Sequence, residues 1–211
     1  MISGLKTAEL RRRVLPLLAL LCTAPAAWAF DLPELMGLLG RQQHGQATFV
    51  EQRFVHGLEG PLDASGTLSF EAPDKLVRQT LTPRQETMRV DGNVLMLSRG
   101  GRTRTLTLDS MPELLGMVDA LRGTLAGNSL LLEKSFRTQL EGNSAQWRLQ
   151  LQPTDQRLAA QVRELVIAGR AGEVLRVEMS FVGGDRSAMD ITPVAAVPAA
   201  PAGQGSAAPA R

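Results

Sequence analysis

The sequence has few aromatic residues, one cysteine and two histidines, and these shortages exclude several kinds of chemistry. The single cysteine, Cys22, cannot form a disulfide within the chain, and with only His44 and His56 available no Cys/His zinc site can be assembled. The sequence also lacks a Gly-x-Ser-x-Gly motif, a P-loop and a dinucleotide-binding fingerprint. A catalytic triad built on His56 is conceivable, but nothing places its members together. We therefore expect no enzymatic activity, no cofactor and no metal ion.

The N-terminus lacks an apolar run long enough to span a bilayer comfortably, because the run at residues 14–22 is short. This run follows a basic segment, residues 6–13, and precedes Ala27-Trp28-Ala29, which has the Ala-x-Ala form of a cleavage site. We interpret residues 1–29 as a signal peptide cleaved after Ala29, with export to the periplasm. An N-terminal membrane anchor is the alternative. Lipidation of Cys22 is rejected because it needs a small residue just before the cysteine, and Leu21 is there.

Without those residues the chain also lacks a strong charge. The formal net charge of +2 comes from 23 basic and 21 acidic groups; residues 1–29 hold four of the former and one of the latter, which leaves −1. A nearly neutral chain has no electrostatic footprint for nucleic acid. The one local basic group, Arg99, Arg102 and Arg104, is interpreted as a solvated face of a hairpin.

Bulky and charged side chains are almost absent from residues 193–211, which consist mainly of alanine, proline and glycine. Such a composition cannot bury enough apolar area to offset the entropy of ordering the chain. We expect a disordered tail there and one folded domain over residues 30–192, which is long enough for one core.

Short alternating segments separated by turn signals dominate this domain. Asp91-Gly92, Gly100-Gly101 and Gly142-Asn143 are turn signals of the kind that join antiparallel strands. The expected strands lie at residues 47–53, 67–70, 76–81, 88–90, 94–97, 102–108, 134–140, 146–152, 163–168, 174–181 and 187–192. Residues 94–97 are apolar on both faces, which is typical of a strand buried between a helix and a sheet or of a strand that lines a binding cavity.

Two amphipathic helices accompany the strands, and a single helical turn is expected at residues 155–161. The first helix follows Asp31 as N-cap, with Pro33 in its first turn, and ends at Gly40 or Gly45. The apolar stripe of this helix consists of Leu32, Leu35, Met36 and Leu39.

The second helix is expected to begin after a cap at Asp109 or Ser110 and to end at Gly127-Asn128. Gly116 and Gly123 lie inside it, and each costs about 1 kcal/mol of helix stability relative to alanine. Either the helix is mobile or the glycines allow close packing on a neighbour. The apolar stripe of this helix consists of Leu114, Leu115, Val118, Leu121 and Leu125.

The order of these elements carries a family resemblance. A Phe-x-x-Gln strand (Phe49, Gln52) is followed by a Gly-x-Leu-x-Phe strand (66–70), by Pro73 and by the Asp91-Gly92 hairpin. This order resembles the LolA family of periplasmic lipoprotein carriers. Leu125-Ala126-Gly127 and the ending at residues 184–189 resemble a divergent LolA-like branch, and the resemblance covers residues 31–192.

The resemblance implies an α+β fold: a curved, incompletely closed antiparallel β half-barrel with helices covering its apolar mouth. One departure concerns Ala72, which stands where LolA itself has an arginine tied to cargo gating. Another is Arg78, near the place where the family tends to have a tryptophan. The gating mechanism of LolA therefore does not transfer to this sequence.

The function implied by the resemblance is shielding of the acyl chains of a lipoprotein or another lipid and their passage toward the outer membrane. The implied partners are that cargo, an inner-membrane exporter and an outer-membrane acceptor; the expected state is a monomer. A periplasmic lipid sensor or protein-interaction module without transport is the alternative. The candidate cavity and cover residues are Leu68, Phe70, Met88, Val90, Met96, Leu97, Leu114, Leu115, Val118, Leu121, Trp147, Leu149, Met179 and Phe181.

Overall fold

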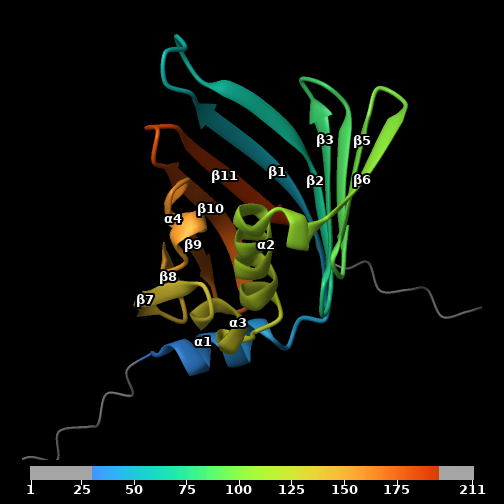
Figure 1. Cartoon of the computed structure of the whole chain (residues 1–211). Helices are drawn as coiled ribbons and strands as arrows, with labels where there is room; N and C mark the ends of the chain where they lie inside the picture. The colour runs from blue at the N-terminus through green and yellow to red at the C-terminus, as the bar shows by residue number, and fades with distance from the viewer. Residues whose placement is uncertain (1–29, 195–211) are drawn as a thin grey trace, which may run out of the picture.

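The alternating segments pair into one 11-stranded antiparallel sheet in the computed structural model, which describes residues 30–194 (Figure 1). The strands are β1 (His44–Phe54), β2 (Leu62–Glu71), β3 (Lys75–Thr82), β4 (Glu86–Asp91), β5 (Val94–Arg99), β6 (Arg102–Thr107), β7 (Phe136–Asn143), β8 (Gln146–Pro153), β9 (Val162–Arg170), β10 (Glu173–Phe181) and β11 (Arg186–Pro193). All eleven expected strands are present. Pro193 is the last residue of β11, whereas the predicted signal peptide and the rest of the predicted tail lie outside the described residues.

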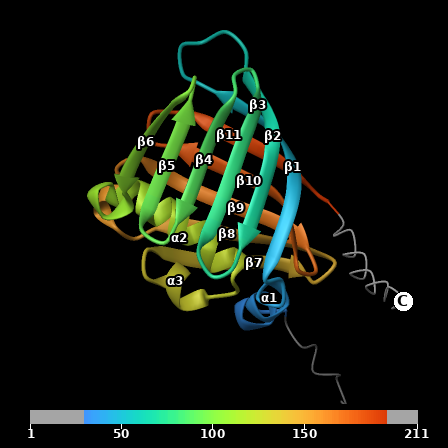
Figure 2. The same cartoon turned by 90° about the vertical axis from the view of Figure 1, so that its right-hand side faces the viewer.

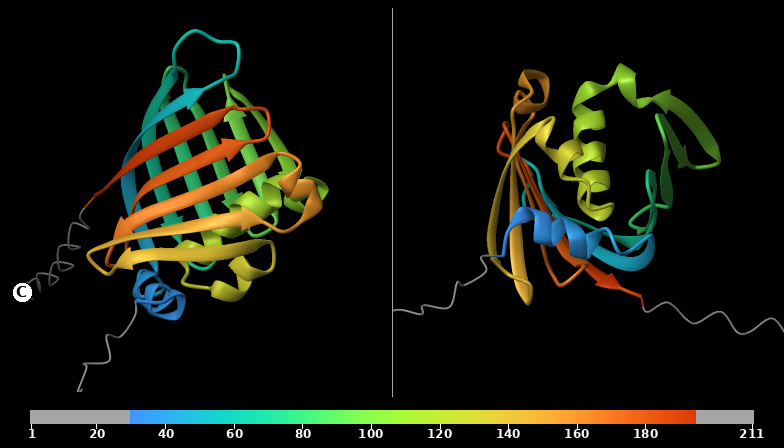
Figure 3. Two further views of the ribbon diagram at one scale, coloured as in Figure 1. Left: turned by 90° about the vertical axis from the view of Figure 1, so that its left-hand side faces the viewer. Right: turned by 90° about the horizontal axis from the view of Figure 1, so that it is seen from below.

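The sheet is curved but not closed. Its strand order is β6-β5-β4-β3-β2-β1-β11-β10-β9-β8-β7, so the chain is folded about β1, which pairs with both β2 and β11 (Figure 2). The edge strands β6 and β7 do not pair with each other. Seen from below, the sheet bends into a U that encloses a helix (Figure 3). The predicted α+β half-barrel, with its mouth covered by helices, is confirmed.

The helices lie in and below the mouth of the U (Figure 1). They are α1 (Leu32–Leu39), the 3₁₀ turn η1 (Leu108–Ser110), α2 (Pro112–Leu125), α3 (Ser129–Glu133) and α4 (Gln156–Ala159). Asp31 caps α1 as predicted, and its carboxylate accepts the Glu34 amide at 2.9 Å.

The predicted start of α2 is wrong. Its N-cap is Met111, because Asp109 and Ser110 belong to η1 and their side chains bond elsewhere. The Asp109 carboxylate accepts from Asn93 Nδ2 at 2.5 Å, and the Ser110 hydroxyl donates to the Thr107 carbonyl at 2.7 Å.

Helix α3 was not predicted. Asn128 both follows α2 and caps α3, because its side chain accepts the Leu131 amide at 3.2 Å. The strand expected from residue 134 therefore begins only at Phe136. Leu132 of α3 is fully buried and belongs to the core.

Two apolar clusters form the core. The larger cluster joins α1, α2 and α3 to β7–β10, and contains the fully buried Leu35, Trp147 and Leu149. The smaller cluster joins η1 and the first half of α2 to β4 and β5, around Val90, Leu95, Leu108 and Val118. Helix α2 contributes to both clusters and so links the two arms of the U.

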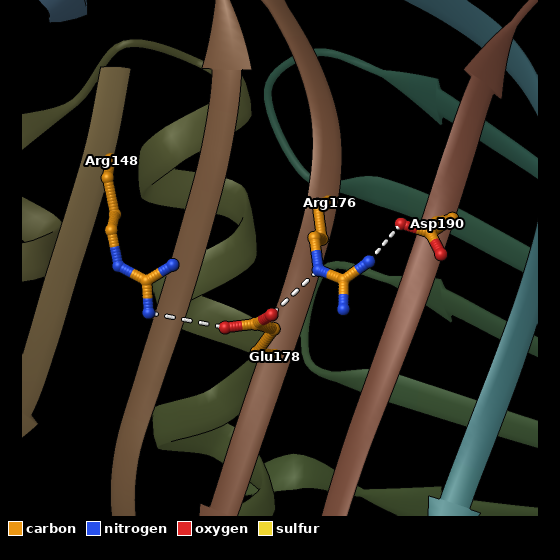
Figure 4. A network of polar contacts seen from close by, with 4 residues as sticks. All are labelled: Arg148, Arg176, Glu178 and Asp190. Atoms are coloured by element: carbon orange, nitrogen blue, oxygen red, sulfur yellow. Dashed lines mark hydrogen bonds and ion pairs between the residues drawn. The ribbon is translucent and has the colours of Figure 1, made fainter. Parts of the chain in front are cut away.

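The convex face of the sheet is polar and carries a chain of ion pairs (Figure 4). Glu178 accepts from Arg176 at 2.7 Å and from Arg148 at 3.2 Å, and Arg176 also donates to Asp190 at 2.5 Å. The hydrogen bond from Arg176 is the main cause that lowers the pKa of Glu178. Val166, the register partner of Glu178, is buried on this face, so the charged side chains also cover apolar surface.

Candidate functional site

The concave face changes from apolar to charged along the strands of one arm. Strand register places side chains in rows across β2–β6, and alternate residues point to opposite faces. The row nearest α2, here the apolar row, consists of Phe70, Leu76, Val90, Leu95 and Leu106. The next row, the mixed row, consists of Leu68, Arg78, Met88, Leu97 and Arg104. The third row, the polar row, consists of Gly66, Thr80, Glu86, Arg99 and Arg102.

Helix α2 covers the apolar row. Val118 is buried against Val90 and Leu95, and Leu114 and Leu115 pack around them. In Figure 3, α2 lies inside the U over this arm. The 3₁₀ turn η1 extends it with the buried Leu108, so within residues 30–194 α2 and η1 shield the apolar part of this concave face from water.

Arg122 ties this helix to the edge of the sheet. Its guanidinium donates to the carbonyl of Asp74, in the β2–β3 turn, at 2.7 Å and to the carbonyl of Gly92, in the β4–β5 turn, at 2.5 Å. Arg122 is buried, and its Nε finds no hydrogen-bond partner among the described residues. Asp119 lies 3.9 Å from Arg122, and burial raises the pKa of the Asp119 carboxyl while the arginine opposes that shift.

A cavity of about 350 Å³ lies on the concave face beside the covered region. Its volume is at the low end of the range of roughly 300–1,000 Å³ for small-molecule sites. The apolar part of its lining consists of Met88, Met117, Met179 and Phe181. The polar part consists of Glu51, Arg53, Arg78, Thr80, Glu86 and Ser187. A cavity with one apolar and one charged wall suits an amphiphilic ligand.

A buried ion pair forms the floor of the charged wall. Glu51 is only 7% exposed, and its carboxylate accepts from Arg78 and, at 2.5 Å, from the Ser187 hydroxyl. The Arg78 guanidinium also stacks 4.6 Å from the centre of the Phe49 ring. These contacts fix the orientation of Arg78 and satisfy both charges. Glu51 is therefore a buried, paired carboxylate and not a solvated one.

The sequence-predicted site residues fall into three groups. Those that line the cavity are Met88, Met179 and Phe181. Those that lie elsewhere on the concave face or on α2 are Leu68, Phe70, Val90, Leu97, Leu114, Leu115, Val118, Leu121, Trp147 and Leu149. The third group is Met96 alone, which pairs in register with Arg89 and therefore lies on the convex face. We exclude Met96 from the proposed lining, and Leu95 takes its place.

The polar lining was not predicted. Alternation along single strands does not show which side chains meet, because only closure of the sheet turns Arg53, Glu86 and Ser187 toward one cavity. Met117 was also missed because it lies beside the expected stripe of α2. A signal for the polar wall was present, since Arg99, Arg102 and Arg104 alternate along the strands with Ser98, Thr103 and Thr105, which places the three arginines together on one face of the hairpin.

No helix within residues 30–194 is long and apolar enough to cross a membrane. Over the same residues, no group of three or more His, Cys, Asp or Glu side chains is arranged to hold a metal ion.

Comparison with known proteins identifies one family model. The model described as outer membrane lipoprotein carrier protein LolA-like matches residues 24–210. A search among curated proteins found no match.

Solved structures of similar fold include a LolA superfamily protein from Nitrosomonas europaea, with 12% identity, a TM-score of 0.43, and coverage of 76% of this chain and 90% of the other. The MucA/MucB complex of Pseudomonas aeruginosa matches with 16% identity, a TM-score of 0.43, and coverage of 77% and 56%. A putative outer membrane lipoprotein-sorting protein domain from Vibrio parahaemolyticus matches with 9% identity, a TM-score of 0.41, and coverage of 79% and 92%.

Proposed function

Since this chain belongs to the LolA-like family of outer membrane lipoprotein carrier proteins, we propose that it is a periplasmic carrier that shields the acyl chains of a lipoprotein or another lipid. The cargo lies in the concave face of the half-barrel and passes from an inner-membrane exporter toward an outer-membrane acceptor. Delivery to the periplasm rests on the signal-like sequence of residues 1–29.

The observation that carries this proposal is the single helix over the apolar row. Leu114, Leu115 and Val118 of α2 cover Val90 and Leu95, so removing the helix would expose an apolar wall ready for an acyl chain. Full burial of a side chain of this size contributes about 1.5–3 kcal/mol, and only Val118 is fully buried while Leu114 and Leu115 are partly buried, so the three together contribute less than about 9 kcal/mol. An acyl chain of about sixteen carbons contributes about 0.8 kcal/mol per methylene, which is on the order of 10 kcal/mol in total. An acyl chain can therefore displace the helix, and the helix competes with it for the same apolar wall.

The cavity supports the same proposal. It gives an entering chain a starting point next to α2, where Met88, Met117 and Met179 form an adaptable wall. A long acyl chain can enter this cavity of about 350 Å³ completely only if α2 moves. Uptake of cargo is therefore linked to displacement of α2.

Native mass spectrometry of the secreted protein, with lipid extraction, tests the proposal. We expect a co-purifying acylated molecule. Leu97→Gln should weaken its binding about fivefold to tenfold, because a lining side chain loses apolar contact. Met96→Gln is the matched control, since this neighbour in β5 lies on the opposite face and should leave binding unchanged.

A transfer assay separates a carrier from a binding module. Lipid bound to the protein should move from donor to acceptor vesicles faster than it moves without protein. Protein purified without lipid that also takes up no fluorescent fatty acid would overturn the proposal. Tight binding without transfer would favour a lipid sensor.

A further inference from the structure

The open part of the concave face holds more arginines than carboxylates can neutralise. Arg53 and Arg78 line the cavity, and Arg99, Arg102 and Arg104 continue the same face on the β5–β6 hairpin. Among the described residues that line the cavity, only Glu51 and Glu86 are acidic. Glu51 forms an ion pair with Arg78, and Glu86 forms one with Arg99 at 3.7 Å.

The remaining arginines lack acidic partners. Within residues 30–194, no ion pair joins Arg53, Arg102 or Arg104 to a carboxylate, and Arg102 and Arg104 are exposed. Arg99 and Arg102 are direct cross-strand partners, an arrangement that destabilises a hairpin through like-charge repulsion. An anion held between these side chains would remove that repulsion.

The apolar neighbours indicate what the anion is attached to. Met88 lies in the mixed row next to Arg78, and Leu97 is the direct register partner of Arg104. Met117, Met179 and Phe181 face the same cavity from α2 and β10. A free inorganic anion would make no favourable contact with this apolar wall, whereas a lipid would pack the first carbons of its acyl chain against it.

We propose that the β5–β6 hairpin and the charged wall of the cavity bind the anionic headgroup of the cargo, a phosphate or carboxylate at the end of an acyl chain. This inference rests on the proposed function and specifies its substrate class as an anionic amphiphile. The buried Glu51–Arg78 pair contributes no net charge; it holds the floor of the site rigid. Arg102 and Arg104 supply the charge that holds the headgroup, and Arg53, five strand positions away across the sheet, adds to the field that attracts it.

Calorimetric titration with two single-chain lipids tests this inference. One carries a glycerophosphate headgroup and the other a phosphocholine headgroup on the same acyl chain. The anionic lipid should bind about tenfold more tightly, as expected for one or two added charge-assisted hydrogen bonds. The preference should shrink in high salt because the arginines are exposed.

The double variant Arg102→Gln, Arg104→Gln should abolish the preference and leave binding of the phosphocholine lipid unchanged. The control is Arg89→Gln with Arg137→Gln, two exposed arginines on the convex face, which removes the same charge elsewhere. Equal thermal unfolding of both variants would show that the fold is intact.

The outcomes separate this inference from the proposed function. Equal affinity for both lipids, unaffected by the double variant, would overturn the headgroup site and leave acyl-chain binding standing. Inorganic phosphate binding as tightly as the anionic lipid would overturn it as well, because no chain would then be required. Failure of both lipids to bind would overturn the carrier proposal too.

Discussion

Glu178 on the convex face is a residue whose ionisation the fold changes. Arg176 lowers its pKa below the ordinary 4.5, so the ionised carboxylate stabilises the folded state above pH 4.5. That stabilisation is lost as the pH falls through the lowered pKa. Glu178→Gln should therefore reduce stability at pH 7, by about 0.5 kcal/mol after allowing for solvent screening. Thermal unfolding between pH 3 and 7 measures the difference from the parent protein.

The control for this prediction is Glu59→Gln, in the exposed loop between β1 and β2. It should leave the pH dependence unchanged. A Glu178→Gln deficit as large at pH 3 as at pH 7 would show that the carboxylate does not act through its charge.

Residues of the candidate site also mark the limit of sequence reasoning. Strand register places Arg78 and Met88 side by side on the concave face, whereas the alternation of the sequence could not say which face of a strand is concave. Closure of the sheet buries Glu51, a strand carboxylate that periodicity alone does not distinguish from a solvated one. Met96 was included in the lining because the run at residues 94–97 is apolar on both faces.

Two glycines of helix α2 allow neighbouring helices to pack closely against it. A Cβ at Gly123 would lie 2.9 Å from Leu132 Cδ2 and 3.1 Å from the Asn128 carbonyl oxygen, and one at Gly116 would lie 2.8 Å from Leu158 Cδ2. Gly123→Ala should gain about 1 kcal/mol of helix propensity but lose about 1–3 kcal/mol to overpacking, with net destabilisation. Chemical denaturation measures the change in the free energy of unfolding.

A third helical glycine provides the matched control. Apart from the local backbone of α1 itself, no atom of the described residues lies within 4 Å of a Cβ added at Gly37, so Gly37→Ala should stabilise the protein by roughly 0.5–1 kcal/mol. Opposite signs for the two substitutions are the expected result. Stabilisation by both would mean that α3 shifts away from α2 easily, and that close packing does not explain Gly123.

Elements were more predictable than their junctions. The Asp-Gly and Gly-Gly turns predicted where the flanking strands end and begin, because the preference of these residues for hairpin turns depends on local backbone conformation alone. The region between α2 and β7 was not predictable in this way. Asn128 serves there as the end of one helix and the cap of the next, and α3 is too short to show a hydrophobic period.

At the scale of the whole molecule, Arg122 connects helix α2 to the arm of the sheet, β2–β6, that α2 shields. Arg122 comes from α2 and donates to the carbonyl of Asp74, in the β2–β3 turn that also contains Ala72 and Pro73. Arg122→Met keeps most of the side-chain volume but removes the hydrogen bonds to Asp74 and Gly92. The folded state should lose about 1–3 kcal/mol, mainly through detachment of α2.

Hydrogen exchange and lipid uptake both measure how often α2 detaches from the sheet in this variant. The α2 amides of Arg122→Met should exchange about tenfold faster or more, and uptake of a fluorescent fatty acid should accelerate, because the open state is more populated. Arg157→Met, at an exposed arginine of α4, should change neither rate. Faster exchange of the α2 amides without faster uptake of the fatty acid would mean that opening of α2 does not limit the rate of uptake. The acyl chain would then enter through the polar cavity beside α2. Unchanged exchange would show that the apolar contacts of Val118 and its neighbours hold α2 without help from the arginine.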